Sequence, residues 1–180
     1  MRKTIIVPER EFWDELTESF ITVPATELVL EHSLFSISKW EAIWHKPFLS
    51  KDDKTLEETT SYVQCMTIND VDPSVYLALT QQNIDDVSEY ITDPMTATWF
   101  SKTPKGGNKK VNTSELLYYY MVAFHIPFEC EHWHLNRLLT LIRVCDEESS
   151  VPNKKQKRGN LSMRYAEMNY KRQKAKASKG

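Results

Sequence analysis

The sequence predicts an α+β fold that is predominantly helical, with a compact acidic body, a short β-strand or hairpin element and a basic C-terminal tail. Its 180 residues are 41% hydrophobic, which suits one domain with a real core. Several Ser, Thr or Asn residues are followed three positions later by Glu, a signal that starts helices. One stretch, ELVLEHSLF (27–35), instead alternates between apolar and polar residues, as a strand does.

The first expected element is a helix over EREFWDELTESF (9–20), directly after Pro8. Phe12, Trp13, Leu16 and Phe20 fall on one face at helical spacing. The strand over 27–35 follows, with Leu28, Leu30, His32 and Leu34 on one side. An imidazole on an apolar side is either a metal ligand or a hydrogen-bonded core group, and the second reading is favoured for His32.

Three capping boxes and one further cap predict the starts of the next helices. They are Ser38 with Glu41, Thr55 with Glu58, Asn112 with Glu115, and Thr80 before QQNIDDVSEYI (81–91). Pro47 is expected to end the first of these helices. The helix SELLYYYMVAF (114–124) is apolar nearly all round, which predicts a central place in the core. Between the expected helices at 81–91 and 114–124, residues 95–112 predict a strand or hairpin with a basic, exposed tip.

The stretch HIPFECEHWHLNRLL (125–139) raises the question of a metal site, because it holds three histidines and a cysteine. On a helix starting near Glu129, His132 and His134 would point in nearly opposite directions, so they would not chelate together. Cys130 and His134 have a useful spacing, and His125 is a third candidate, but no zinc spacing motif is complete. The prediction is a packing helix without a metal, with His134 beside the core face and His132 facing solvent.

Motifs for catalysis are absent from the sequence. Its four glycines form neither GxGxxG nor GxxxxGK[ST], and no GxSxG occurs. The three cysteines are widely spaced and fit reduced thiols, with Cys65 and Cys145 expected to be buried and inert. The sequence therefore predicts a protein that is not an enzyme, with no catalytic residue and no cofactor.

Nothing in the sequence predicts a membrane partner or a secretory signal. The N-terminal apolar run stops after four residues, and the longest apolar stretch, LLYYYMVAF, is about half the length of a membrane span. The expected location is the cytoplasm.

Charge divides the chain into an acidic body, residues 1–148, and a basic linker and tail, residues 149–180, expected to be flexible or weakly helical. Residues 151–180 hold ten Lys or Arg against one Glu, which leaves 13 basic and 24 acidic residues in 1–150. The candidate partner-binding residues are Lys154, Lys155, Lys157, Arg158, Arg164, Tyr165, Lys171, Arg172 and Lys174.

Three roles are open for this tail. Its cations suit nucleic-acid phosphates, with Tyr165 and Tyr170 stacking on bases. They equally suit an acidic protein or the acidic body, or the tail is simply solvated. Leu161, Tyr165 and Met168 are spaced for an amphipathic helix in a partner's groove, which favours a protein partner slightly.

Two stretches, LEHSLFSISKWEAIWHKPFL (30–49) and IPFECEHWHLNRLLTLIRVC (126–145), resemble a family of small bacteriophage proteins known as tail assembly chaperones, and so does the short basic tail. The resemblance implies a protein without an active site or cofactor. It also implies binding to the long, helical tape measure protein of the phage tail in the host cytoplasm. The alternative expectation is a virion structural or nucleic-acid-binding protein that uses the basic tail.

Overall fold

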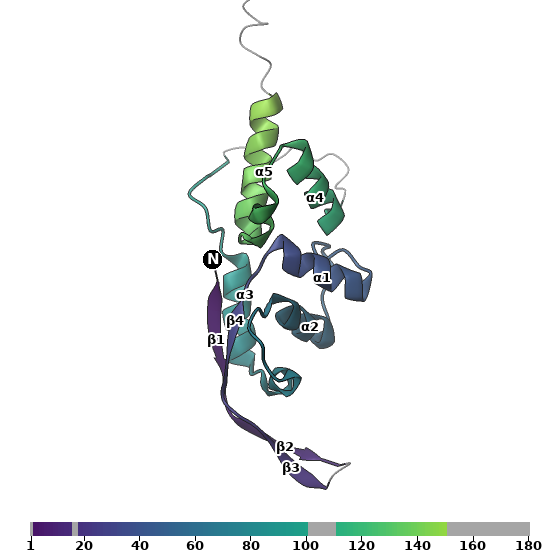
Figure 1. The fold of residues 1–180 in the computed structure, drawn as a ribbon, viewed down its shortest axis with the longest axis vertical. Coiled ribbons are helices and arrows are strands. Elements are labelled where there is room, and N and C mark those ends of the chain that lie inside the picture. Colours follow the sequence, from purple (N-terminus) through teal and green to yellow (C-terminus); the bar gives the residue numbers. More distant parts are fainter. Residues whose placement is uncertain (1, 16–17, 101–110, 151–180) are drawn as a thin grey trace, which may run out of the picture. The chain divides into compact units, whose positions relative to one another are not determined.

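The computed structural model describes residues 2–15, 18–100 and 111–150 (Figure 1). These residues form an α+β fold that is predominantly helical, with two antiparallel two-stranded sheets, which confirms the predicted class. The chain divides into two units, residues 1–142 and 143–180. The boundary between body and tail at residue 148 stays a prediction.

The inner sheet pairs β1 (Lys3–Val7) with β4 (Thr26–Leu30). Ile5, Val7, Leu28 and Leu30 are buried, so this sheet contributes an apolar face to the core. Residues 67–68 return to the edge of β4, where the Ile68 amide donates to the Val29 carbonyl at 3.0 Å. The predicted strand over 27–35 is thus right up to Leu30.

The outer sheet corrects the prediction of a helix over 9–20. These residues belong instead to a hairpin of β2 (Arg10–Asp14) and β3 (Ser19–Val23). Phe12 lies opposite Ile21 and Trp13 opposite Phe20, so the apolar residues pair across strands rather than along one helical face. The two ladders are separated by Pro8–Glu9 and Pro24–Ala25, where each proline lacks an amide donor.

The first two helices are α1 (Leu34–Trp44) and α2 (Leu56–Met66). The capping box of Thr55 and Glu58 is confirmed, but Ser33 rather than Ser38 caps α1. The α1 helix ends at Trp44, before Pro47 is reached, and its C-cap His45 has a left-handed conformation. The indole of Trp40 donates from Nε1 to the Glu58 carbonyl at 2.9 Å, which fixes α1 against α2 in the core.

A 3₁₀ helix, η1 (Pro73–Ala78), leads into α3 (Gln81–Thr92), whose predicted cap Thr80 is confirmed. The buried positions of α3 are Asn83, Val87 and Tyr90. Asn83 donates from Nδ2 to the Ile6 carbonyl at 2.9 Å, which attaches α3 to β1.

The helix α4 (Ser114–Ala123) corrects two expectations. Its cap is Thr113 and not Asn112, and the helix is not central. Only Ser114, Leu117 and Met121 are buried, while Tyr119 is 63% and Val122 59% exposed. Because α4 is apolar nearly all round, its composition did not show that only one of its sides is buried.

The predicted strand or hairpin over 95–112 is not found in the described part of that stretch, where 95–100 and 111–112 carry no strand. Residues 101–110, including the basic tip, lie outside the described residues.

The last elements are η2 (Phe128–His132) and α5 (Leu135–Ser150). The final helix therefore begins at Leu135, and not near Glu129 as expected. Leu135, Leu138 and Ile142 of α5 are buried. Among the described residues, no helix has the length and hydropathy that a membrane span requires.

Candidate protein-interaction surface

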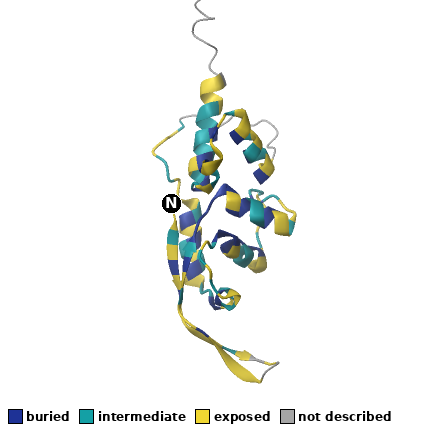
Figure 2. Ribbon diagram, in the orientation of Figure 1, coloured by how far each residue is buried: buried dark blue, intermediate teal, exposed yellow. Residues whose placement is uncertain are grey.

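The most exposed aromatic pair of the described chain lies on the outer hairpin. Trp13 and Phe20 are opposite one another, with ring centroids 5.0 Å apart in an edge-to-face arrangement. Yet Trp13 is 54% and Phe20 66% exposed. Figure 2 shows most of the described hairpin in the colour of exposed residues. Alternation along the strands places Glu11 and Thr22 on the same face, which we call the aromatic face.

The opposite face of the hairpin is attached to the body. Val23 is buried, Phe12 is half-buried, and β3 contacts η1. The guanidinium of Arg10 lies over the Phe12 ring, 5.3 Å from the ring centroid, in a cation–π contact. One side of the hairpin is therefore used for folding, and the aromatic face is left to solvent.

Among the described residues, β2 and β3 form a sheet of two strands, so no third strand lies along either edge of the hairpin. A two-stranded hairpin is only marginally stable in water, and free edges accept further strands. Residues 8–25 carry five acidic residues and one arginine, so neighbouring copies repel each other at this site. The combination of exposed rings, free edges and acidic side chains suits binding of a different chain.

Two of the five histidines, His32 and His134, belong to the core. His32 and His134 are each 1% exposed, with ring centroids 4.9 Å apart. The Nδ1 of His32 shares a 2.6 Å hydrogen bond with the Tyr62 hydroxyl, and His134 donates from Nε2 to the Tyr90 carbonyl at 3.0 Å. The predicted hydrogen-bonded core role of His32 is confirmed, as is the core position of His134.

Burial sets the protonation of this histidine pair. Desolvation, aided by repulsion from His134, lowers the pKa of His32 to about 3. Burial likewise lowers the pKa of His134. Since the Tyr90 carbonyl only accepts, the neutral His134 carries its proton on Nε2. Its buried Nδ1 has no hydrogen-bond partner among the described residues.

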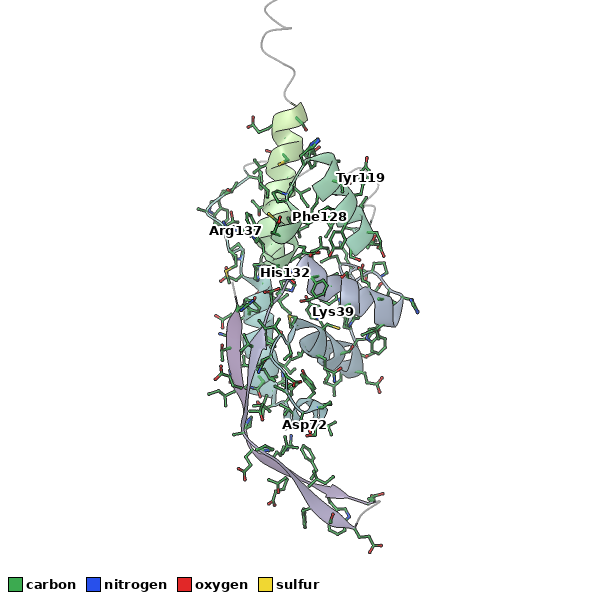
Figure 3. All side chains as sticks on the ribbon, viewed as in Figure 1. Lys39, Asp72, Tyr119, Phe128, His132 and Arg137 are labelled. Carbon is green, nitrogen blue, oxygen red and sulfur yellow. The ribbon has the colours of Figure 1, made fainter. Side chains whose placement is uncertain are left out.

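His132 is half-exposed, with 51% of its side chain in solvent, as expected (Figure 3). Its Nδ1 lies 2.9 Å from Oε1 of Glu31, a buried carboxylate that also meets Arg2 at 3.4 Å. No group of three His, Cys, Asp or Glu side chains within the described ranges is placed to hold a metal.

A second buried carboxylate has a structural position. Glu41 accepts from the Phe48 amide through Oε1 and from the Ser114 amide through Oε2, both at 2.7 Å. It lines a polar pocket with His45, Lys46 and Glu115. Both Glu41 oxygens accept from backbone amides, so this carboxylate fixes the start of α4.

The cysteines are free thiols. Cys65 is buried as predicted, and so is Cys130, but Cys145 is only half-buried, which corrects the expectation for that residue. Burial raises the pKa of the Cys65 and Cys130 thiols, which keeps both protonated at neutral pH.

The candidate residues of the tail all lie outside the described residues, so their role stays a prediction. The sequence prediction missed the aromatic face, because it placed Trp13 and Phe20 on one face of a helix. Their symmetric placement about residues 15–18 was the available signal for a hairpin. Comparison with protein families, curated proteins and solved structures found no match to this chain.

Proposed function

We propose that this protein is a non-enzymatic assembly chaperone that binds a protein client, the tape measure protein of a bacteriophage tail, in the host cytoplasm. The observation that carries the binding role is the exposed Trp13–Phe20 pair on a hairpin with free edges. The identity of the client rests on the resemblance of residues 30–49 and 126–145 to phage tail assembly chaperones.

The aromatic face supplies what a holding protein needs. Two adjacent rings offer a large apolar contact at small conformational cost, and aromatic residues often dominate binding energy. A client segment in extended conformation also gains main-chain hydrogen bonds at the edge of β2 or β3. The acidic residues that flank the rings keep the unbound hairpin soluble.

A pull-down with matched variants tests this proposal. Tagged full-length protein is recovered from nuclease-treated cells that express the surrounding gene cluster, and bound proteins are identified by mass spectrometry. The binding variant is Trp13→Thr with Phe20→Thr, because threonine keeps the β propensity of the hairpin. The control is Ile43→Gln on α1, which removes an apolar side chain that is 60% exposed but lies outside the hairpin.

We expect wild type and the Ile43 variant to recover one long helical protein, and the hairpin variant to lose it while its thermal unfolding stays cooperative. Equal recovery by all three proteins would contradict a role of the aromatic face. Recovery of capsid or tail-tube subunits instead would contradict the proposed client.

The alternative function is nucleic-acid binding by the tail, favoured by the ten cations in residues 151–180. Protein purified without nuclease would then carry excess absorbance at 260 nm that high salt removes. Retention of nucleic acid together with an empty pull-down would replace the chaperone proposal with this one.

A further inference from the structure

An open apolar groove of about 420 Å³ lies where α2, η1 and α3 meet. Its apolar lining comes from Leu56, Tyr76, Leu77, Leu79 and Ile84. Leu56 is 76% and Leu77 69% exposed, so these two leucines face solvent rather than the core. Large apolar side chains that converge on a hollow are typical of a docking site.

The segment that forms this groove is acidic. Residues 51–92, which contain all three elements, hold nine Asp or Glu and two Lys, and of these acids Glu58 is buried and paired with Lys46 at 2.6 Å. Glu57 lines the groove itself. Lys54 is engaged elsewhere, because its Nζ lies 4.5 Å from the Phe48 ring centroid. The net charge of this segment attracts a cationic partner and repels an acidic one.

The backbone of the lining elements determines the form of the partner. Leu56 and Ile84 belong to helices whose backbone groups beyond the first turn bond within the helix, and η1 lies between the two helices in the chain. An extended chain gains no main-chain hydrogen bonds at such a surface. A helix satisfies its own backbone and offers side chains at i, i+4 and i+7, which suits a hollow of this kind.

We propose that this groove binds a basic amphipathic helix of a protein partner. The apolar side chains of that helix contact Leu56, Leu77 and Ile84, and its Lys or Arg residues face Glu57 and the acidic residues of 51–92. The inference does not rest on the chaperone role, since it concerns a different surface with its own chemistry.

A titration with a defined peptide tests this site on the full-length protein. The probe is a fluorescently labelled helix of about 18 residues of leucine and lysine, about five turns long. The control peptide keeps the leucines and replaces every lysine by glutamate. The groove variant is Leu56→Gln with Leu77→Gln, both at exposed positions, and the control variant is again Ile43→Gln.

We expect the lysine peptide to bind wild type and the Ile43 variant, and to bind the groove variant at least about tenfold more weakly. Glu57→Gln and added salt should each weaken binding. Binding of the glutamate peptide with equal affinity, or unchanged binding by the groove variant, would overturn the proposal.

The chain's own tail carries the same apolar spacing at Leu161, Tyr165 and Met168. A second full-length protein, with these three residues changed to serine, removes this internal competitor. Tighter peptide binding by this protein supports the groove and shows that a tail segment competes for it. Equal binding by both supports an outside partner, and binding by neither sinks the proposal.

Discussion

The Nδ1 of His32 and the hydroxyl of Tyr62 are 2.6 Å apart inside the core, in a hydrogen bond between two groups that are 1% and 3% exposed. His32 lies just after β4 and Tyr62 lies on α2, so the bond joins the end of the inner sheet to that helix. It also ties a titratable imidazole to the stability of the fold.

The first prediction is a loss of stability on acidification. The pKa of His32 is lowered to about 3 from an ordinary value near 6.5, so below pH 6.5 the unfolded chain binds a proton that the folded chain does not. Its contribution is complete above pH 6.5 and is lost as the pH falls toward 3. One such proton gives a slope of at most about 1.4 kcal/mol per pH unit.

Urea unfolding between pH 7 and pH 5 measures this slope. His32→Gln should be less stable at neutral pH but show a flatter pH dependence than wild type. His125→Asn, at an exposed position with positive φ that Asn tolerates, is the control and should keep the wild-type slope. An unchanged slope in the His32 variant would show that other groups cause the acid sensitivity.

The second prediction concerns the hydroxyl itself. Tyr62→Phe leaves the buried His32 Nδ1 without this partner, and the free energy of unfolding should fall by about 1–3 kcal/mol. Tyr119→Phe removes a hydroxyl from a ring that is 63% exposed and should change stability by less than about 0.5 kcal/mol. Chemical denaturation of both variants at pH 7 compares them, and equal losses would contradict the assignment.

The third prediction tests the carboxylate between α1 and α4. Glu41→Gln replaces one of the two accepting oxygens by an NH₂ group that faces a backbone N–H. We expect the free energy of unfolding to fall by about 2 kcal/mol. Hydrogen exchange at the Ser114 amide should accelerate at the same time. Glu129→Gln, at an exposed position, is the control. Unchanged exchange at Ser114 would show that α4 is held in another way.

The fourth prediction checks where the first two helices begin. Ser33→Ala and Thr55→Ala each remove an N-cap and should cost about 1 kcal/mol. Ser38→Ala removes a hydroxyl inside α1 that donates to the Phe35 carbonyl, and it should cost less than about 0.5 kcal/mol. A larger loss at Ser38 than at Ser33, measured by urea denaturation, would restore the start that the sequence predicted.

The elements that the sequence predicted correctly are those decided by neighbouring residues. The caps at Thr55 and Thr80 depend on side chains three positions away and were predicted correctly, whereas the same local pattern misplaced the caps at Ser38 and Asn112. The outer hairpin was missed because Phe12, Trp13 and Phe20 satisfy a helical spacing and a cross-strand pairing equally well. Only the pairing partners decide between them.

The candidate surfaces were harder to predict, since exposure depends on distant packing. That Leu56 and Leu77 converge on one groove follows from the placement of η1 beside α2, which no local pattern shows. The meeting of His32 and His134 likewise requires the chain to return after about a hundred residues. Nor does the sequence show that α4 buries one side only.

The two prolines between the ladders have a mechanical consequence. At Pro8 and Pro24 the ribbon that runs from β1 into β2 and from β3 into β4 loses amide donors, and its stiffness falls at that joint. A load applied to Trp13 and Phe20 is then taken up by bending at the joint. The inner pairing of Ile5 with Leu28 is spared, so a pull on the hairpin leaves β1 in the core.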